Sequence, residues 1–195
     1  FNVIDAVRAL RQLFTDASAR WLGFGNSQGG QAVWASNEVA TQYGAGLELV
    51  GTVALSPAAN VTAMADLAGS QSLTAEQEAL LPLVAGGVAR YNPKLVEESL
   101  LPRLTAEQES RAFSCGADAE TLRDELIPPE SISLDDERSV AVFRTALRRI
   151  ALPQTPLSAP MLVINGLADQ TILPQWVTAA VEESCRLGGR IQHVE

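Results

Sequence analysis

Hydrophobic residues recur at helical spacing at the start of the chain. Val3, Val7, Leu10 and Phe14 lie three or four residues apart, with charged and polar residues between them. This spacing predicts an amphipathic helix that ends near Thr15 and packs one face against a sheet.

Four short apolar runs have the length and composition of strands. They span residues 20–24, 49–55, 161–165 and 190–194. The run 49–55 is rich in β-branched residues and nearly uncharged, as is typical of strands buried on both faces of a parallel sheet. Helical patterns over 31–43, closed by Gly44, and over 174–187, closed by Gly188, separate the runs. The order strand, helix, strand predicts an α/β fold with a mostly parallel sheet.

The alternation stops between residues 57 and 158. This segment consists of acid-rich amphipathic stretches, which we expect to be broken at prolines including Pro82, Pro93 and Pro102. Two Thr-x-x-Gln capping boxes, which begin at Thr74 and Thr105, predict two helix starts. We therefore expect a helical cap (lid) at 57–158, inserted into an α/β core made of 1–56 and 159–195.

The pentapeptide Gly25-Asn26-Ser27-Gln28-Gly29 joins the first predicted strand to the following helix. A Gly-x-Ser-x-Gly sequence in this setting is typical of a nucleophile elbow. The serine then has a positive φ, and glycines two residues before and after it prevent Cβ collisions. We interpret Ser27 as a catalytic nucleophile and the Gln28 backbone N–H as an oxyanion donor. The alternative is a glycine-rich connection with an exposed serine.

A serine nucleophile needs an imidazole base and a carboxylate that orients it, in the chain order serine, acid, histidine in α/β-hydrolases. Asp169 follows the strand 161–165 through Gly166-Leu167-Ala168 and would stand at the carboxyl edge of the sheet. We therefore predict that Asp169 is the catalytic acid. The alternative is an aspartate that forms a turn or caps a helix.

His193 is the one histidine of the sequence, and it lies inside the last predicted strand. Its ring would then lie between the sheet and a covering helix, so we expect a buried or edge histidine and not the base. We expect the base a few residues beyond Glu195. We also expect that the chain, which begins with Phe1 inside a helix, lacks the first part of the sheet and the second oxyanion donor.

Composition narrows the class of partner. The chain has 195 residues, 47% of them hydrophobic, and a net charge of −9. That charge disfavours nucleic acids and anionic membranes, so we expect uncharged substrates. No apolar run approaches the roughly 20 residues of a transmembrane helix. Cys115 and Cys185 lack the spacing of a metal site, and spacing leaves open whether they form a disulfide.

Two segments carry a specific resemblance to a known family. Gly-Asn-Ser-Gln-Gly-Gly-Gln-Ala at 25–32 and Val-Ile-Asn-Gly-Leu-Ala-Asp-Gln-Thr at 163–171 resemble the secretory lipase family of α/β-hydrolases, which includes yeast lipase A. The resemblance implies a cap inserted between strands 6 and 7, Ser27 as nucleophile, Gln28 as oxyanion donor and Asp169 as acid. It also implies secretion and catalysis without a cofactor. The family's histidine has no match in this sequence.

These observations predict a serine carboxylic ester hydrolase, a lipase or esterase, that cleaves neutral acyl esters through an acyl-enzyme. One alternative is an α/β-hydrolase of other specificity, such as an acyl-peptide or polyester hydrolase. Another is a binding homologue without catalysis. The oligomeric state is left open by the sequence.

Overall fold

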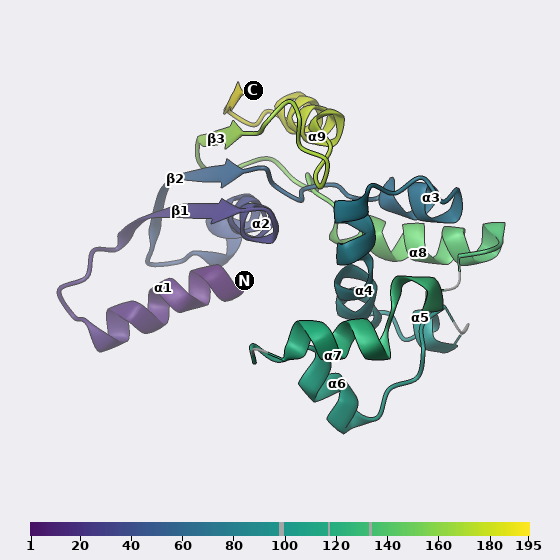
Figure 1. Cartoon of the computed structure of the whole chain (residues 1–195). Coiled ribbons are helices and arrows are strands. Elements are labelled where there is room, and N and C mark those ends of the chain that lie inside the picture. Colours follow the sequence, from purple (N-terminus) through teal and green to yellow (C-terminus); the bar gives the residue numbers. More distant parts are fainter. Residues whose placement is uncertain (98–99, 117, 133) are drawn as a thin grey trace. The chain divides into compact units, whose positions relative to one another are not determined.

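The computed structural model of the protein describes residues 1–97, 100–116, 118–132 and 134–195 (Figure 1). The chain forms two compact units. The core unit comprises Phe1–Val61 and Ala151–Glu195, and the helical unit comprises Thr62–Ile150. Residues 57–61 and 151–158, which lie in the segment expected to form the cap, thus belong to the core unit.

The core unit contains a four-stranded parallel sheet in the order β1-β2-β3-β4 (Figure 1). Its elements follow one another as α1 (Asn2–Leu13), β1 (Arg20–Asn26), α2 (Gln28–Tyr43), β2 (Glu48–Leu55), β3 (Met161–Ile164), α9 (Pro174–Arg186) and β4 (Ile191–Val194). The predicted α/β fold with a parallel sheet is confirmed. Helix α2 begins three residues earlier than expected, directly after Ser27.

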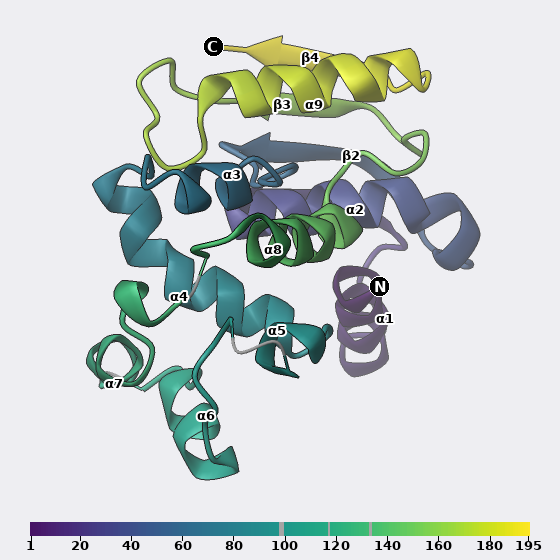
Figure 2. The same cartoon turned by 90° about the vertical axis from the view of Figure 1, so that its right-hand side faces the viewer.

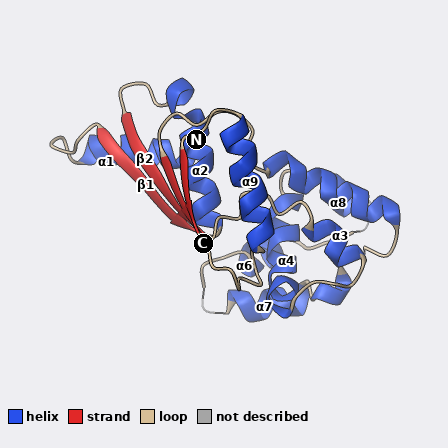
Figure 3. Ribbon diagram, turned by 90° about the horizontal axis from the view of Figure 1, so that it is seen from above, coloured by secondary structure: helices blue, strands red, loops and turns tan. Residues whose placement is uncertain are grey.

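Helices α2 and α9 lie on the same side of the sheet (Figures 2 and 3). The hydrophobic core lies between them and the strands, and its largest member is Trp34, which is fully buried. From the sheet, Ala54, Met161 and Val163 contribute to this core, and α9 contributes Val177, Ala180 and Val181. Alternate residues of each strand point to this covered face, as the period of a strand requires.

Two buried polar residues of α2 fix that helix to the sheet and to the chain before β3. The side-chain amide of Asn37 donates to Thr52 Oγ1 at 2.8 Å and to the Ala159 carbonyl at 3.0 Å, while Asn37 Oδ1 accepts from the Ala159 N–H at 2.9 Å. The Glu38 carboxylate accepts the backbone N–H groups of Gln154 and Thr155. Burial raises the pKa of Glu38, while these backbone bonds act in the opposite direction.

The helical unit is formed by six helices and one 3₁₀ turn among the described residues. They are α3 (Met64–Gly69), α4 (Ala75–Ala89), α5 (Lys94–Glu97), α6 (Ala106–Ala112), α7 (Ala119–Leu126), η1 (Pro129–Ser131) and α8 (Glu137–Ile150). Both predicted capping boxes are confirmed, because Thr74 and Thr105 each bond reciprocally with the glutamine three residues later. Arg144 of α8 pairs with Asp66 of α3.

The expected helix break at Pro82 is wrong, because Pro82 lies inside α4. Proline removes only one N–H from the helix ladder, and the burial of Leu81, Ala85 and Val88 on the same helix offsets that loss. Among the residues described, no helix is both long and apolar enough to cross a bilayer. Cys115 and Cys185 are free, exposed thiols, which answers the question left open by their spacing.

Candidate active site

Ser27 occupies the sharp turn between β1 and α2. Its φ of 53° is positive, as expected for a nucleophile elbow. The Ser27 N–H donates to the Leu55 carbonyl at 2.9 Å, and the Ser27 carbonyl accepts the N–H groups of Gln31 at 3.0 Å and Ala58 at 3.1 Å. The turn is therefore tied both to the end of β2 and to its own helix, which stabilises an otherwise unfavourable backbone conformation.

The elbow glycines have different roles. A Cβ atom on Gly25 would lie 2.1 Å from the Gly29 carbonyl oxygen, so Gly25 is required for this turn. By contrast, nothing lies within 4 Å of a Cβ atom on Gly29, and the expectation that Gly29 prevents a collision is wrong. The second crowded position is Gly30, whose Cβ atom would lie 3.0 Å from Pro57. The close contact between α2 and the chain after β2 is therefore made at Gly30, one residue after the glycine of the Gly-x-Ser-x-Gly motif.

Gln28 is the first residue of α2, and its side chain is exposed. The first N–H groups of a helix lack intrahelical acceptors, and the helix dipole gives this end a partial positive charge. Ser27 makes no side-chain capping bond, and the first turn of α2 contains no acidic residue. The arrangement can therefore stabilise a negative charge that develops beside Ser27.

Asp169 lies in the turn that follows β3. Its Oδ1 atom accepts the backbone N–H groups of Thr171 and Ile172, each at 2.9 Å. The carboxylate thus forms a local turn, which was the alternative interpretation of this residue. Because both bonds go to Oδ1, this turn leaves Oδ2 for a different donor, and the two roles are compatible.

The sheet register brings Ser27 and Asp169 to one edge. Asn26 pairs with Leu55, and Leu55 pairs with Ile164. Ser27 directly follows the carboxyl end of β1, and Asn165 directly follows the carboxyl end of β3. The two strands are separated by two strand spacings, or about 10 Å. Asp169 lies four residues after Asn165, in the turn in which the Asp169 N–H donates to the Gly166 carbonyl. This edge is where ligands bind in open α/β sheets.

His193 lies within β4, opposite Val163 of β3. Its Nε2 atom is 2.6 Å from Asn165 Oδ1, and this carboxamide is 4% exposed. Since Oδ1 is an acceptor, His193 donates from Nε2. β4 lies three strand spacings, or about 14 Å, from β1, so the ring does not contact Ser27. The sequence analysis did not identify Asn165 as the hydrogen-bond partner of His193. The one signal in the sequence that could have indicated it is that Asn165 is a polar residue at the end of an apolar strand.

Among the residues that the structure describes, no group of three or more histidine, cysteine, aspartate or glutamate side chains is arranged to hold a metal ion. The polar groups at the carboxyl edge of the sheet include Ser27, the first N–H groups of α2 and the Asp169 carboxylate.

Comparisons with solved structures agree with this fold. Lipase A of Candida antarctica in its closed state aligns with a TM-score of 0.65 and 16% identity, over 97% of this chain and 46% of that chain. The cell wall degrading esterase LipA of Xanthomonas oryzae aligns with a TM-score of 0.69 and 19% identity, over 97% of this chain and 54% of that chain. The chain therefore spans about half the length of these proteins.

A search of curated protein sequences finds no match. The sequence profile of a family described as secretory lipase, however, matches residues 1–194. That match covers nearly the whole chain and includes both the Ser27 elbow and the Asp169 turn. The protein belongs to the secretory lipase family.

Proposed function

We propose that this protein is a serine carboxylic ester hydrolase, a lipase or esterase, that acts on neutral acyl esters. The observation that carries the proposal is the conformation of Ser27, which has a positive φ at the junction of strand β1 and the N-terminus of helix α2. Family membership supports the same activity, and the net charge of −9 favours uncharged substrates over anionic ones.

In this proposal, Ser27 Oγ attacks the carbonyl carbon of the ester while an imidazole takes its proton. The Gln28 N–H stabilises the tetrahedral oxyanion, and the alcohol leaves with the proton that the imidazole returns. Water then hydrolyses the acyl-enzyme by the same route. Asp169 Oδ2 accepts the N–H of the imidazole, which fixes its tautomer and stabilises its cation.

The proposed base is a histidine outside residues 1–195, just after β4. The Asn165 N–H donates to the Val194 carbonyl at 3.1 Å, so β4 ends at the same carboxyl edge as β3. A residue in a loop after β4 would emerge beside the Asp169 turn. His193 lies one residue before Val194, the last residue of β4, and its Nε2 already donates to Asn165.

We propose that the insertion 57–158 acts as a cap that selects the acyl group. Its first residues, 57–61, belong to the core unit, where the Ala58 N–H donates to the Ser27 carbonyl. Loops at the carboxyl edge of an α/β sheet commonly carry the specificity of the site. Family membership supports secretion as the localisation of the protein.

The test is labelling of the natural protein with a fluorophosphonate, followed by identification of the labelled peptide. Labelling at Ser27, its loss in Ser27→Ala, and hydrolysis of p-nitrophenyl butyrate are expected. Labelling of another serine that persists in Ser27→Ala would contradict the nucleophile assignment. A folded natural protein that is neither labelled nor active would instead favour a binding homologue, and faster cleavage of a peptide anilide would favour an acyl-peptide hydrolase.

A further inference from the structure

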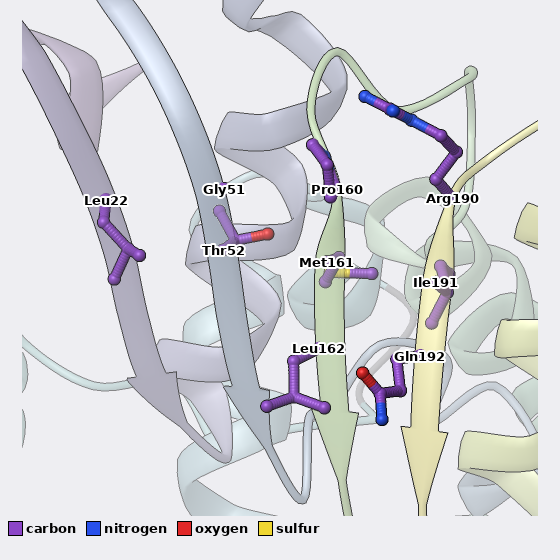
Figure 4. A pocket seen from close by; sticks show the side chains of 9 residues that line it. All are labelled: Leu22, Gly51, Thr52, Pro160, Met161, Leu162, Arg190, Ile191 and Gln192. Carbon is purple, nitrogen blue, oxygen red and sulfur yellow. The ribbon is translucent and has the colours of Figure 1, made fainter.

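The residue that directly follows each of the first three strands makes the same hydrogen bond to the next strand. The three bonds run from the Ser27 N–H to the Leu55 carbonyl at 2.9 Å, from the Ser56 N–H to the Ile164 carbonyl at 2.7 Å, and from the Asn165 N–H to the Val194 carbonyl at 3.1 Å. Ser56 thus lies in one row with Ser27 at the carboxyl edge, one strand spacing or about 5 Å away on the side of β3. Figure 4 shows the strands side by side, with β2 between β1 and β3. The hollow of about 430 Å³ in that view lies nearer the amino ends, around Gly51 and Met161, and takes no part in this row.

Ser56 shares the unusual backbone conformation of the nucleophile elbow. Its φ is 35°, and among the described residues other than glycine only Ser27 and Gln71 also have a positive φ. This sign is unfavourable for a residue with a Cβ atom, and a residue that precedes a proline, as Ser56 does, is normally extended. Glycine would adopt the conformation without strain. The chain therefore holds a side chain where the backbone favours none.

The Ser56 hydroxyl is held beside the elbow and is available to a ligand. The chain on either side of it is tied to Ser27, because the Leu55 carbonyl accepts the Ser27 N–H and the Ala58 N–H donates to the Ser27 carbonyl. The side chains of Ser27 and Ser56 are both half-buried. Within the part of the chain that the structure describes, Ser56 Oγ makes no hydrogen bond. Its donor is therefore free for a group that binds at Ser27.

We propose that Ser56 is a further catalytic residue, whose hydroxyl donates a hydrogen bond to the alcohol oxygen of the ester as the C–O bond breaks. This inference rests on the proposed function. There, the oxyanion faces the first N–H groups of α2, and the imidazole that protonates the alcohol oxygen is oriented by Asp169, which follows β3. The alcohol oxygen thus lies on the β3 side of Ser27, and β2, which ends at Ser56, is the strand between them.

The step balances without an additional reactant. The bond from Ser27 Oγ to the carbonyl carbon has formed, and the bond from that carbon to the alcohol oxygen breaks with its electron pair on the oxygen. The imidazolium supplies the proton. Ser56 keeps its own proton and stabilises the negative charge that develops on the leaving oxygen.

The test compares two butyrate esters on the natural protein. p-Nitrophenyl butyrate and ethyl butyrate form the same acyl-enzyme, so the ratio of their kcat/KM values reports the step in which the alcohol leaves. p-Nitrophenolate is a stable anion and needs little stabilisation, whereas ethoxide needs much. Ser56→Ala should therefore lower kcat/KM for ethyl butyrate by about tenfold or more, and for p-nitrophenyl butyrate by no more than about threefold.

Ser56→Gly separates this role from a structural one. It removes the hydroxyl and also the strain, so it should change the ratio of the two esters as Ser56→Ala does, without lowering the melting temperature. Gln71→Gly is the matched control, because it relieves a φ of 53° in the helical unit. It should leave the ratio of the two esters unchanged.

Other outcomes overturn the inference. If Ser56→Ala is folded and lowers both esters equally, or neither, Ser56 does not contact the leaving oxygen. A change in the ratio that appears only with a lower melting temperature in both Ser56 variants would identify a structural role. A natural protein that is neither labelled at Ser27 nor active would overturn the proposed function and this inference with it, whereas an active one with an unchanged ratio in Ser56→Ala overturns this inference alone.

Discussion

A Cβ atom on Gly25 would lie 2.1 Å from the carbonyl oxygen of Gly29, far inside van der Waals contact. The end of β1 and the start of α2 therefore approach each other more closely than any side chain at position 25 permits. This contact, with the positive φ of Ser27, produces the elbow.

Gly25→Ala should destabilise the protein by about 1–3 kcal/mol, because the neighbouring atom is main chain and cannot rotate away. Gly29→Ala is the matched control: its Cβ meets nothing within 4 Å, and alanine is favoured over glycine in a helix by roughly 0.5–1 kcal/mol. Urea unfolding of both variants checks this. Equal destabilisation by the two substitutions would show that the motif glycines are equivalent after all.

Asp169→Asn should lower ester turnover by roughly 10³–10⁴-fold in the natural protein without lowering its melting temperature. The reason is that asparagine keeps Oδ1 as an acceptor for Thr171 and Ile172 but loses the charge. Asp169→Ala removes both bonds and should lower turnover and stability together. If Asp169→Asn retains activity within a few-fold of the wild type, the acid lies elsewhere.

His193→Ala should cost about 1–3 kcal/mol of stability, because it leaves Asn165 Oδ1 unpaired in a site that is 4% exposed. Ester hydrolysis by the natural protein should stay within a few-fold of the wild type. Thermal unfolding of the variant and the wild type checks the loss of stability, and turnover of p-nitrophenyl butyrate checks the activity. A variant that is fully folded but inactive would make His193 the base and our interpretation of β4 wrong.

Glu38→Gln should change how stability depends on pH. Burial raises the pKa of Glu38 in the folded protein above its ordinary value, so the folded state binds more protons than the unfolded state at pH values just above the ordinary pKa of a glutamate. The wild type therefore loses stability as pH rises through this window, and the glutamine variant lacks this loss. Urea unfolding at several pH values from 4 to 7 measures the difference. A difference that is independent of pH, or that grows in favour of the wild type, would sink the prediction.

The sequence alone determined the order and type of the main elements. Strands 20–24 and 49–55, for example, are read from local apolar runs, and the capping boxes at Thr74 and Thr105 from residues three apart. These features are encoded by side chains close together in the chain. The motif around Ser27 likewise predicted a positive φ, since only a few residues are needed to specify that turn.

The tertiary structure decided what depends on residues distant in the sequence. The crowding at Gly30 comes from Pro57, and the partner of His193 is Asn165, 28 residues away. Pro82 stays inside a helix because the burial of its neighbours outweighs its local preference. The exposure of Leu22 and Phe24 on the face of the sheet that no helix of the core unit covers was also invisible in the sequence. The strand pattern predicts burial on both faces, whereas the register and the packing reveal which face α2 and α9 cover.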